Sequence, residues 1–193
     1  MKHDGSEADA KRCEEAAQFR KIDAAFRSGD LAALLASVDD PDSVPNGPMP
    51  LSVGPCLEYA IYHSPLSFIR TLLRIGADPN PTDHAGFPPL IAALSCSHPH
   101  PGSPGRNDTL DIIKLLLRHG ADPNQRGINN YTALHMAVGE RHLSAIEALL
   151  EAGADPRLRT TIDDCETPRE MAERAGLVEF ANLLAIYESG LEE

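Results

Sequence analysis

The chain has 193 residues, of which 42% are hydrophobic but only 5% aromatic, with no Trp, and its formal net charge of −12 comes from 29 acidic and 17 basic residues. This length fits one domain or one short repeat array, and a core poor in rings suits packed helices better than a β-sandwich. Because such an acidic surface repels phosphate groups, we expect no nucleic-acid binding and no membrane binding. We interpret the excess of acidic residues mainly as an aid to solubility.

The four cysteines lie far apart and form no CxxC pair, which argues against a zinc knuckle or a thioredoxin-like site. The N-terminal segment has no apolar stretch like a signal peptide, and no apolar run is long enough to span a membrane. We therefore expect a cytoplasmic protein with reduced thiols, or one exported by a route that leaves no such signal.

The first predicted element is a helix over residues 19–38, interrupted by Gly-Asp, and residues 1–18 are expected to lengthen it as an N-terminal extension. The segment Pro41–Asn46 follows as a degenerate closing turn.

Three later segments end alike, in LLRIGADPN (72–80), LLRHGADPN (116–124) and LLEAGADPR (149–157). Before each of them, apolar residues recur at i, i+3, i+6 and i+7, which is one face of a helix. In the last case they are Leu143, Ile146, Leu149 and Leu150. Gly suits the left-handed C-terminal cap of such a helix, and the following Ala-Asp-Pro ends it.

Residues 166–187 repeat the pattern once more, with Pro168 where a first-turn proline is tolerated. Residues 162–193 carry nine carboxylates against Arg169 and Arg174, a local charge of −9 + 2 = −7.

One interval between repeats is longer than the next. Gly76 and Gly120 are 44 residues apart but Gly120 and Gly153 only 33, which places an insertion of 44 − 33 = 11 residues within 95–108. Its sequence, SCSHPHPGSPGRN (95–107), raises the alternative of a metal site built on Cys96, His98 and His100, completed with His84. Residues two apart in a Pro-rich extended segment point about 120° apart, so we favour a Pro-stiffened loop and expect neither a metal nor a cofactor.

The 33-residue period, the T-x-L-H-x-A string at Thr132–Ala137 and the repeated GADPN resemble ankyrin repeats. The resemblance implies an all-α solenoid of stacked helix-turn-helix units joined by short hairpin-like loops. It implies a single domain over 19–193, with repeats at about 19–46, 50–80, 83–124, 127–157 and 162–187, the outer two being degenerate caps.

The same resemblance implies that a protein partner binds the concave face and the loop tips. The residues at those positions are Tyr62, His63, His84, Phe87, Ile128, Asn129, Tyr131, Glu140, Asp163, Asp164, Glu166 and Arg174. Phe87 and Tyr131 either anchor a partner or staple their own helices, and both alternatives stay open. The acidic residues Asp163, Asp164 and Glu166 either meet a basic partner or solvate the terminal cap, and we favour the cap. Asn130 is expected in the left-handed region, and His135 is expected to make structural hydrogen bonds between repeats.

No nucleophile elbow, zincin motif, P-loop or dinucleotide-binding string is present, so we expect no enzyme. The favoured hypothesis is a non-enzymatic protein-binding scaffold, monomeric on its own, such as a bacterial adaptor or a partner that neutralises a basic toxin. The alternative is a metal-binding or host-directed effector module that uses the 95–107 loop.

Overall fold

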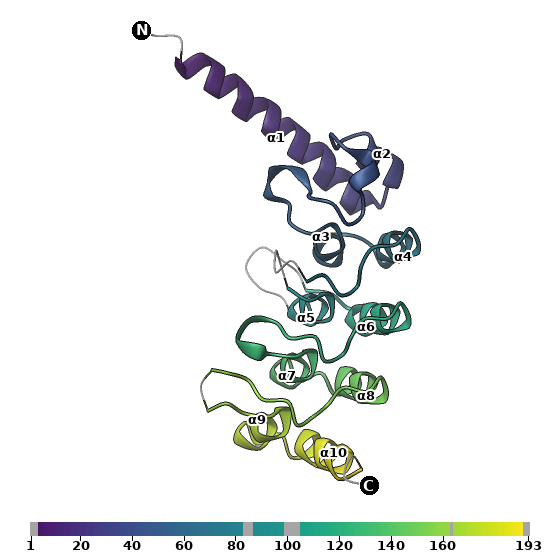
Figure 1. Ribbon diagram of the computed structural model, residues 1–193, viewed down its shortest axis with the longest axis vertical. Coiled ribbons are helices and arrows are strands. Elements are labelled where there is room, and N and C mark those ends of the chain that lie inside the picture. The colour runs from purple at the N-terminus through teal and green to yellow at the C-terminus, as the bar shows by residue number, and fades with distance from the viewer. Residues whose placement is uncertain (1–3, 83–86, 99–104, 163, 191–193) are drawn as a thin grey trace. The chain divides into compact units, whose positions relative to one another are not determined.

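The computed structural model describes residues 4–82, 87–98, 105–162 and 164–190. It divides into two compact units, residues 1–78 and 79–193. The described part contains helices and no strand, and the predicted all-α repeat fold is confirmed (Figure 1).

The first unit begins with a long helix, α1 (Asp4–Ser28), which continues through the predicted extension. It is followed by α2 (Leu31–Leu35), short 3₁₀ turns at Pro41–Ser43 and Pro50–Ser52, α3 (Cys56–His63) and α4 (Leu66–Arg74). Its core contains Phe26, whose ring meets Phe68 edge-on at 5.7 Å between centroids. Among the described side chains of α1, the first that is buried is Ile22, and those of residues 8–14 are exposed.

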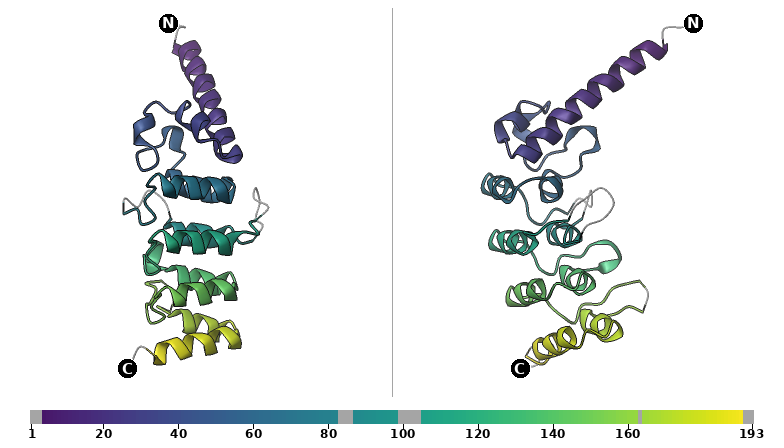
Figure 2. Two further views of the ribbon diagram at one scale, coloured as in Figure 1. Left: turned by 90° about the vertical axis from the view of Figure 1, so that its right-hand side faces the viewer. Right: turned by 180° about the vertical axis from the view of Figure 1, so that it is seen from behind.

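The second unit consists of three helix pairs. The pairs are α5 (Pro89–Ser95) with α6 (Thr109–Arg118), α7 (Ala133–Gly139) with α8 (Leu143–Glu151), and α9 (Pro168–Arg174) with α10 (Val178–Ser189). The inner helices α5, α7 and α9 stack on one another, and the outer helix α8 packs against α6 (Figure 2). The buried Ile113, Leu116, Ile146 and Leu149 confirm the predicted apolar faces of α6 and α8.

The GADPN motifs of successive repeats are linked by hydrogen bonds. Gly76, Gly120 and Gly153 all have positive φ (98°, 86° and 90°), as predicted for helix C-terminal caps. The Asn124 side chain then donates to Gly153 O (3.1 Å) and accepts from Asp155 N (2.8 Å) of the next repeat. Asn80 makes the same pair of bonds with Gly120 and Asp122. Within the first unit Asn46 does so with Gly76 and Asp78, which confirms that the degenerate turn substitutes for a GADPN.

Candidate protein-binding surface

The loop of residues 125–131, here called the fourth finger loop, is a tight hairpin. Tyr131 N donates to Ile128 O (3.1 Å), and Gly127 N donates to Tyr131 O (2.8 Å). Asn129 and Asn130, which lie between Ile128 and Tyr131, both have positive φ (56° and 59°), as in a type I′ turn. The prediction for Asn130 is confirmed, and Asn129 adopts the same region. The turn leaves Ile128 68% exposed at the tip.

The fifth finger loop, residues 158–166, is bonded to the fourth. Thr161 N donates to Asn129 O (2.9 Å), and Thr160 N donates to Glu166 O (3.1 Å) within its own hairpin. Ile162 in this loop is 39% exposed. Two neighbouring loops therefore each carry an exposed isoleucine, and a hydrogen bond ties one loop to the other.

His135 on α7 supports the base of both finger loops. It is fully buried, and its Nδ1 accepts from Thr132 N (3.2 Å), which places the ring proton on Nε2. Nε2 then donates to Glu166 O (3.1 Å) in the next repeat, so the predicted structural role between repeats is confirmed. Burial lowers the pKa of His135 below 6.5, although the Glu166 carbonyl opposes this shift.

The two aromatic residues expected at the loops differ in exposure. The Tyr131 ring lies 5.4 Å from the His135 ring and is half-buried, so it covers the entry to α7. Phe87, at the corresponding position before α5, is 40% exposed. Tyr131 therefore fulfils the stapling role in part, and Phe87 keeps an accessible ring.

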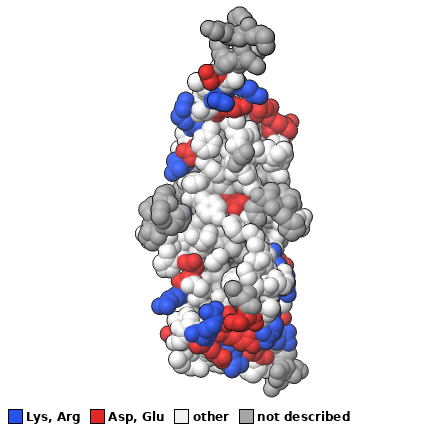
Figure 3. All heavy atoms as spheres, turned by 90° about the vertical axis from the view of Figure 1, so that its left-hand side faces the viewer, with Lys and Arg blue, Asp and Glu red and all other residues white. Residues whose placement is uncertain are grey.

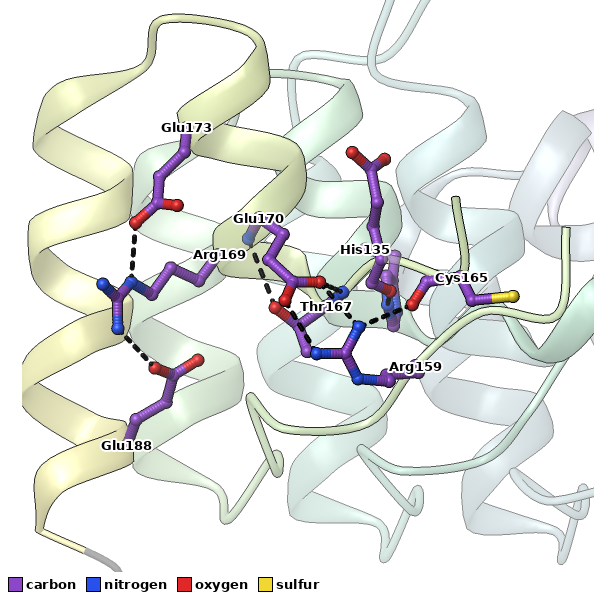
Figure 4. Close-up of polar contacts among 9 residues, drawn as sticks. His135, Arg159, Cys165, Thr167, Arg169, Glu170, Glu173 and Glu188 are labelled. Atoms are coloured by element: carbon purple, nitrogen blue, oxygen red, sulfur yellow. Dashed lines mark hydrogen bonds and ion pairs between the residues drawn. The ribbon is translucent and has the colours of Figure 1, made fainter. Parts of the chain in front are cut away.

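The carboxylates of the last repeat are held by arginines of the same repeat. Glu166, only 9% exposed, accepts two bonds from Arg174 (2.6 and 2.7 Å), and these bonds hold the pKa of its carboxyl below the usual value. The two residues, both expected to contact a partner, thus bind each other. Arg169 likewise bridges Glu173 and Glu188 (Figure 4). Acidic and basic side chains consequently alternate over this repeat in Figure 3.

Glu170 has a comparable partner. It accepts two bonds from Arg159 (2.8 and 2.7 Å), and these bonds lower the pKa of Glu170. Arg159 also donates to Cys165 O (2.8 Å), which ties the fifth finger loop to α9. Glu166, Glu170, Glu173 and Glu188 of this cap are thus paired with arginines, whereas Asp164 is exposed. The cap interpretation stays a prediction.

The other predicted contact residues are scattered. Glu140, at the end of α7, binds His98 Nδ1 (2.6 Å), and Asp164 is exposed. Tyr62 and His63 lie at the end of α3 in the first unit. His84 and Asp163 lie outside the described residues. Ile162 was missed by the sequence analysis, because the fifth finger loop is two residues longer than the fourth and shifts the register of the tip.

The two described ends of the insertion after α5 are joined by a hydrogen bond. Arg106 N donates to Cys96 O (2.8 Å), and the Cys96 thiol, 3% exposed, lies 3.1 Å from Ala92 O. His98 Nδ1 lies 2.6 Å from a carboxylate oxygen of Glu140, and His100, like His84, lies outside the described residues. Among the described residues no three His, Cys, Asp or Glu side chains are placed to hold a metal ion.

A family model described as ankyrin repeats (three copies) matches residues 57–160 and 103–191. The chain belongs to the ankyrin-repeat family. No curated protein matches it. Ankyrin repeats generally mediate protein–protein interaction and are typically non-enzymatic. No helix among the described residues is both long and apolar enough to cross a membrane.

Proposed function

We propose that this ankyrin-repeat chain is a non-enzymatic scaffold that holds a protein partner on the fourth and fifth finger loops and the adjoining inner helices. The observation that carries the proposal is Ile128, which is 68% exposed at the tip of a hydrogen-bonded turn. Apolar anchors on preorganised loops are typical of protein interfaces.

The neighbouring residues support the same surface. Ile162 and Phe87 are 39% and 40% exposed, and the polar Asn129 is exposed beside Ile128. An apolar anchor with a polar rim is the usual anatomy of an interface core.

The charge distribution bears on the kind of partner. The net charge of −12 suggests a basic partner, such as a toxin that the protein neutralises. Glu166 in the fifth finger loop and Glu170 on α9 already hold arginines of their own chain, whereas Asp164 in the same loop is exposed. The exposed isoleucines of the finger loops support a partner docked mainly by apolar contacts, which a neutralised toxin or another bound protein would have to offer.

A site-specific cross-linking experiment tests the proposal. A photoreactive amino acid is placed at position 129, in proteins with Ile128 and with Ile128→Asp, and at position 147 on the exposed side of α8 as a control. We expect one partner to cross-link from position 129 only, and to be lost with Ile128→Asp while the thermal melt stays unchanged. Equal cross-linking from position 147 would contradict the assigned surface.

A further inference from the structure

Two arginines occupy equivalent positions in the fourth and fifth finger loops. Arg126 and Arg159 each stand five residues after the Ala of a GADP turn, since 126 − 121 and 159 − 154 both equal 5. The third residue of the inner helix that follows each loop is also at an equivalent position in the two repeats. It is His135 in α7 and Glu170 in α9.

The fifth repeat shows what such an arginine binds. Arg159 makes a two-pronged ion pair with Glu170 of its own repeat, and it has one further bond to Cys165 O. The guanidinium is therefore neutralised and oriented within the chain.

In the fourth repeat the carboxylate is replaced by a buried neutral imidazole. Among the described residues, Arg126 makes one hydrogen bond, from Nη1 to the backbone oxygen of Arg159 (3.3 Å), and Arg126 is exposed. Its positive charge also opposes protonation of His135 and so contributes to the lowered pKa of that residue, after the larger effect of burial. Arg126 thus presents a positive charge and spare donors two residues before Ile128, on the surface proposed to bind a partner.

We infer that Arg126 receives a carboxylate of the partner, so that the partner is a protein segment with an Asp or Glu next to a bulky apolar residue. The apolar residue covers Ile128, and the partner's carboxylate takes the place that Glu170 takes at Arg159. This inference rests on the proposed function and adds the chemistry of the partner to it. An acidic partner is not what the negative net charge of the chain would attract at long range. At physiological salt, however, charges more than about 8 Å apart are largely screened, so the charge of Arg126 itself determines which partner side chain is favoured beside it.

Random linear peptides displayed on phage provide the test. They are selected against the full chain, and each selected peptide is then synthesised in versions with Glu, Gln or Lys beside its apolar residue. For the wild-type protein we expect the Glu version to bind about fivefold more tightly than the Gln version, the upper end for an exposed ion pair. For Arg126→Gln this preference should vanish, and for Arg126→Glu the Lys version should bind best. Arg118→Gln, an exposed arginine on α6, is the matched control and should leave the ranking unchanged.

The outcomes separate the inference from the function on which it rests. In one outcome, the peptides lose binding to Ile128→Asp, but their Glu, Gln and Lys versions bind equally well to the wild type and to Arg126→Gln. This outcome would overturn the acidic partner and would still support the proposed binding surface. Selected peptides that ignore both Ile128→Asp and Arg126→Gln would contradict the surface and the inference together. Thermal melts of every variant, with Arg126→Lys as the charge-conserving change, show whether a loss of binding reflects unfolding.

Discussion

His135 Nε2 donates to the backbone oxygen of Glu166 over 3.1 Å and across 31 residues of sequence, so one buried imidazole joins the start of α7 to the fifth finger loop. Burial and the bond that Nδ1 accepts from Thr132 N both favour the neutral ring, whereas the bond from Nε2 to Glu166 O also forms with the charged ring and opposes the shift. The stability of the folded chain around His135 should therefore depend on pH.

The first prediction concerns that dependence. The pKa of His135 is lowered in the folded state by burial, so its contribution is complete above its unfolded pKa of about 6.5 and is lost as the pH falls through and below that value. We expect His135→Gln to cost about 1–3 kcal/mol at neutral pH, since two buried hydrogen bonds are disturbed, and the difference from wild type to shrink on acidification. Urea unfolding over a pH series measures this, with His119→Gln at the exposed end of α6 as control. If the free energy of unfolding changes with pH in the same way for wild type and for His135→Gln, protonation of the His135 ring does not contribute to stability and the prediction is wrong.

A second prediction tests the asparagines that bridge successive repeats. Asn124→Ala removes the partners of Gly153 O and Asp155 N, and we expect a loss of about 1–2 kcal/mol in the free energy of unfolding. Asn107→Ala, at an exposed position before α6, should change stability by less than about 0.5 kcal/mol. If both variants unfold at the same urea concentration, the bridging bonds do not contribute.

A third prediction tests the packing between outer helices. Ile113 on α6 is fully buried, so Ile113→Ala should cost about 2–5 kcal/mol through lost burial and the cavity left behind. The neighbouring Lys114 is exposed, and Lys114→Ala is the matched change with an expected effect below about 0.5 kcal/mol. A melt unchanged by Ile113→Ala would refute the assignment of this face to the core.

The fourth prediction concerns Glu166. Its hydrogen bonds from Arg174 lower the pKa of its carboxyl, so its contribution to stability is present above the unfolded pKa of about 4.5 and is lost as the pH falls through the lower folded value. Arg174→Met removes those bonds while burial remains, and we expect the pKa of Glu166 to rise. An NMR titration of the glutamate carboxyl carbons would show the rise, and Arg169→Met, whose partners are Glu173 and Glu188, should leave Glu166 unaffected.

The repeat fold could be predicted from the sequence because local signals and the period agree. Gly120 and Gly153 mark helix ends, Leu149 and Ile113 mark buried faces, and each signal lies within one repeat. The turn that ends at Asn46 could also be predicted, although it lacks the full GADPN motif, because its position in the repeat matches that of the other turns.

The surface was harder to predict because it depends on which side chains pair with one another in the folded chain. Glu166 looks like a free acid in the sequence, yet Arg174, one helix away, neutralises it. No sequence motif marks Arg126. Its role follows from a comparison with the fifth repeat, where a carboxylate occupies the position that His135 has in the fourth. Such exceptions become visible only when equivalent positions of two folded repeats are compared.

The hydrogen bond from Arg106 N to Cys96 O has a practical consequence. It joins the two described ends of the insertion at 2.8 Å, close to the end of α5 and to the start of α6. A loop closed at its base adds little entropic cost when it is lengthened. This makes the insertion a suitable place to graft an epitope, a fluorophore or a second binding peptide while the helix pairs on either side keep their packing.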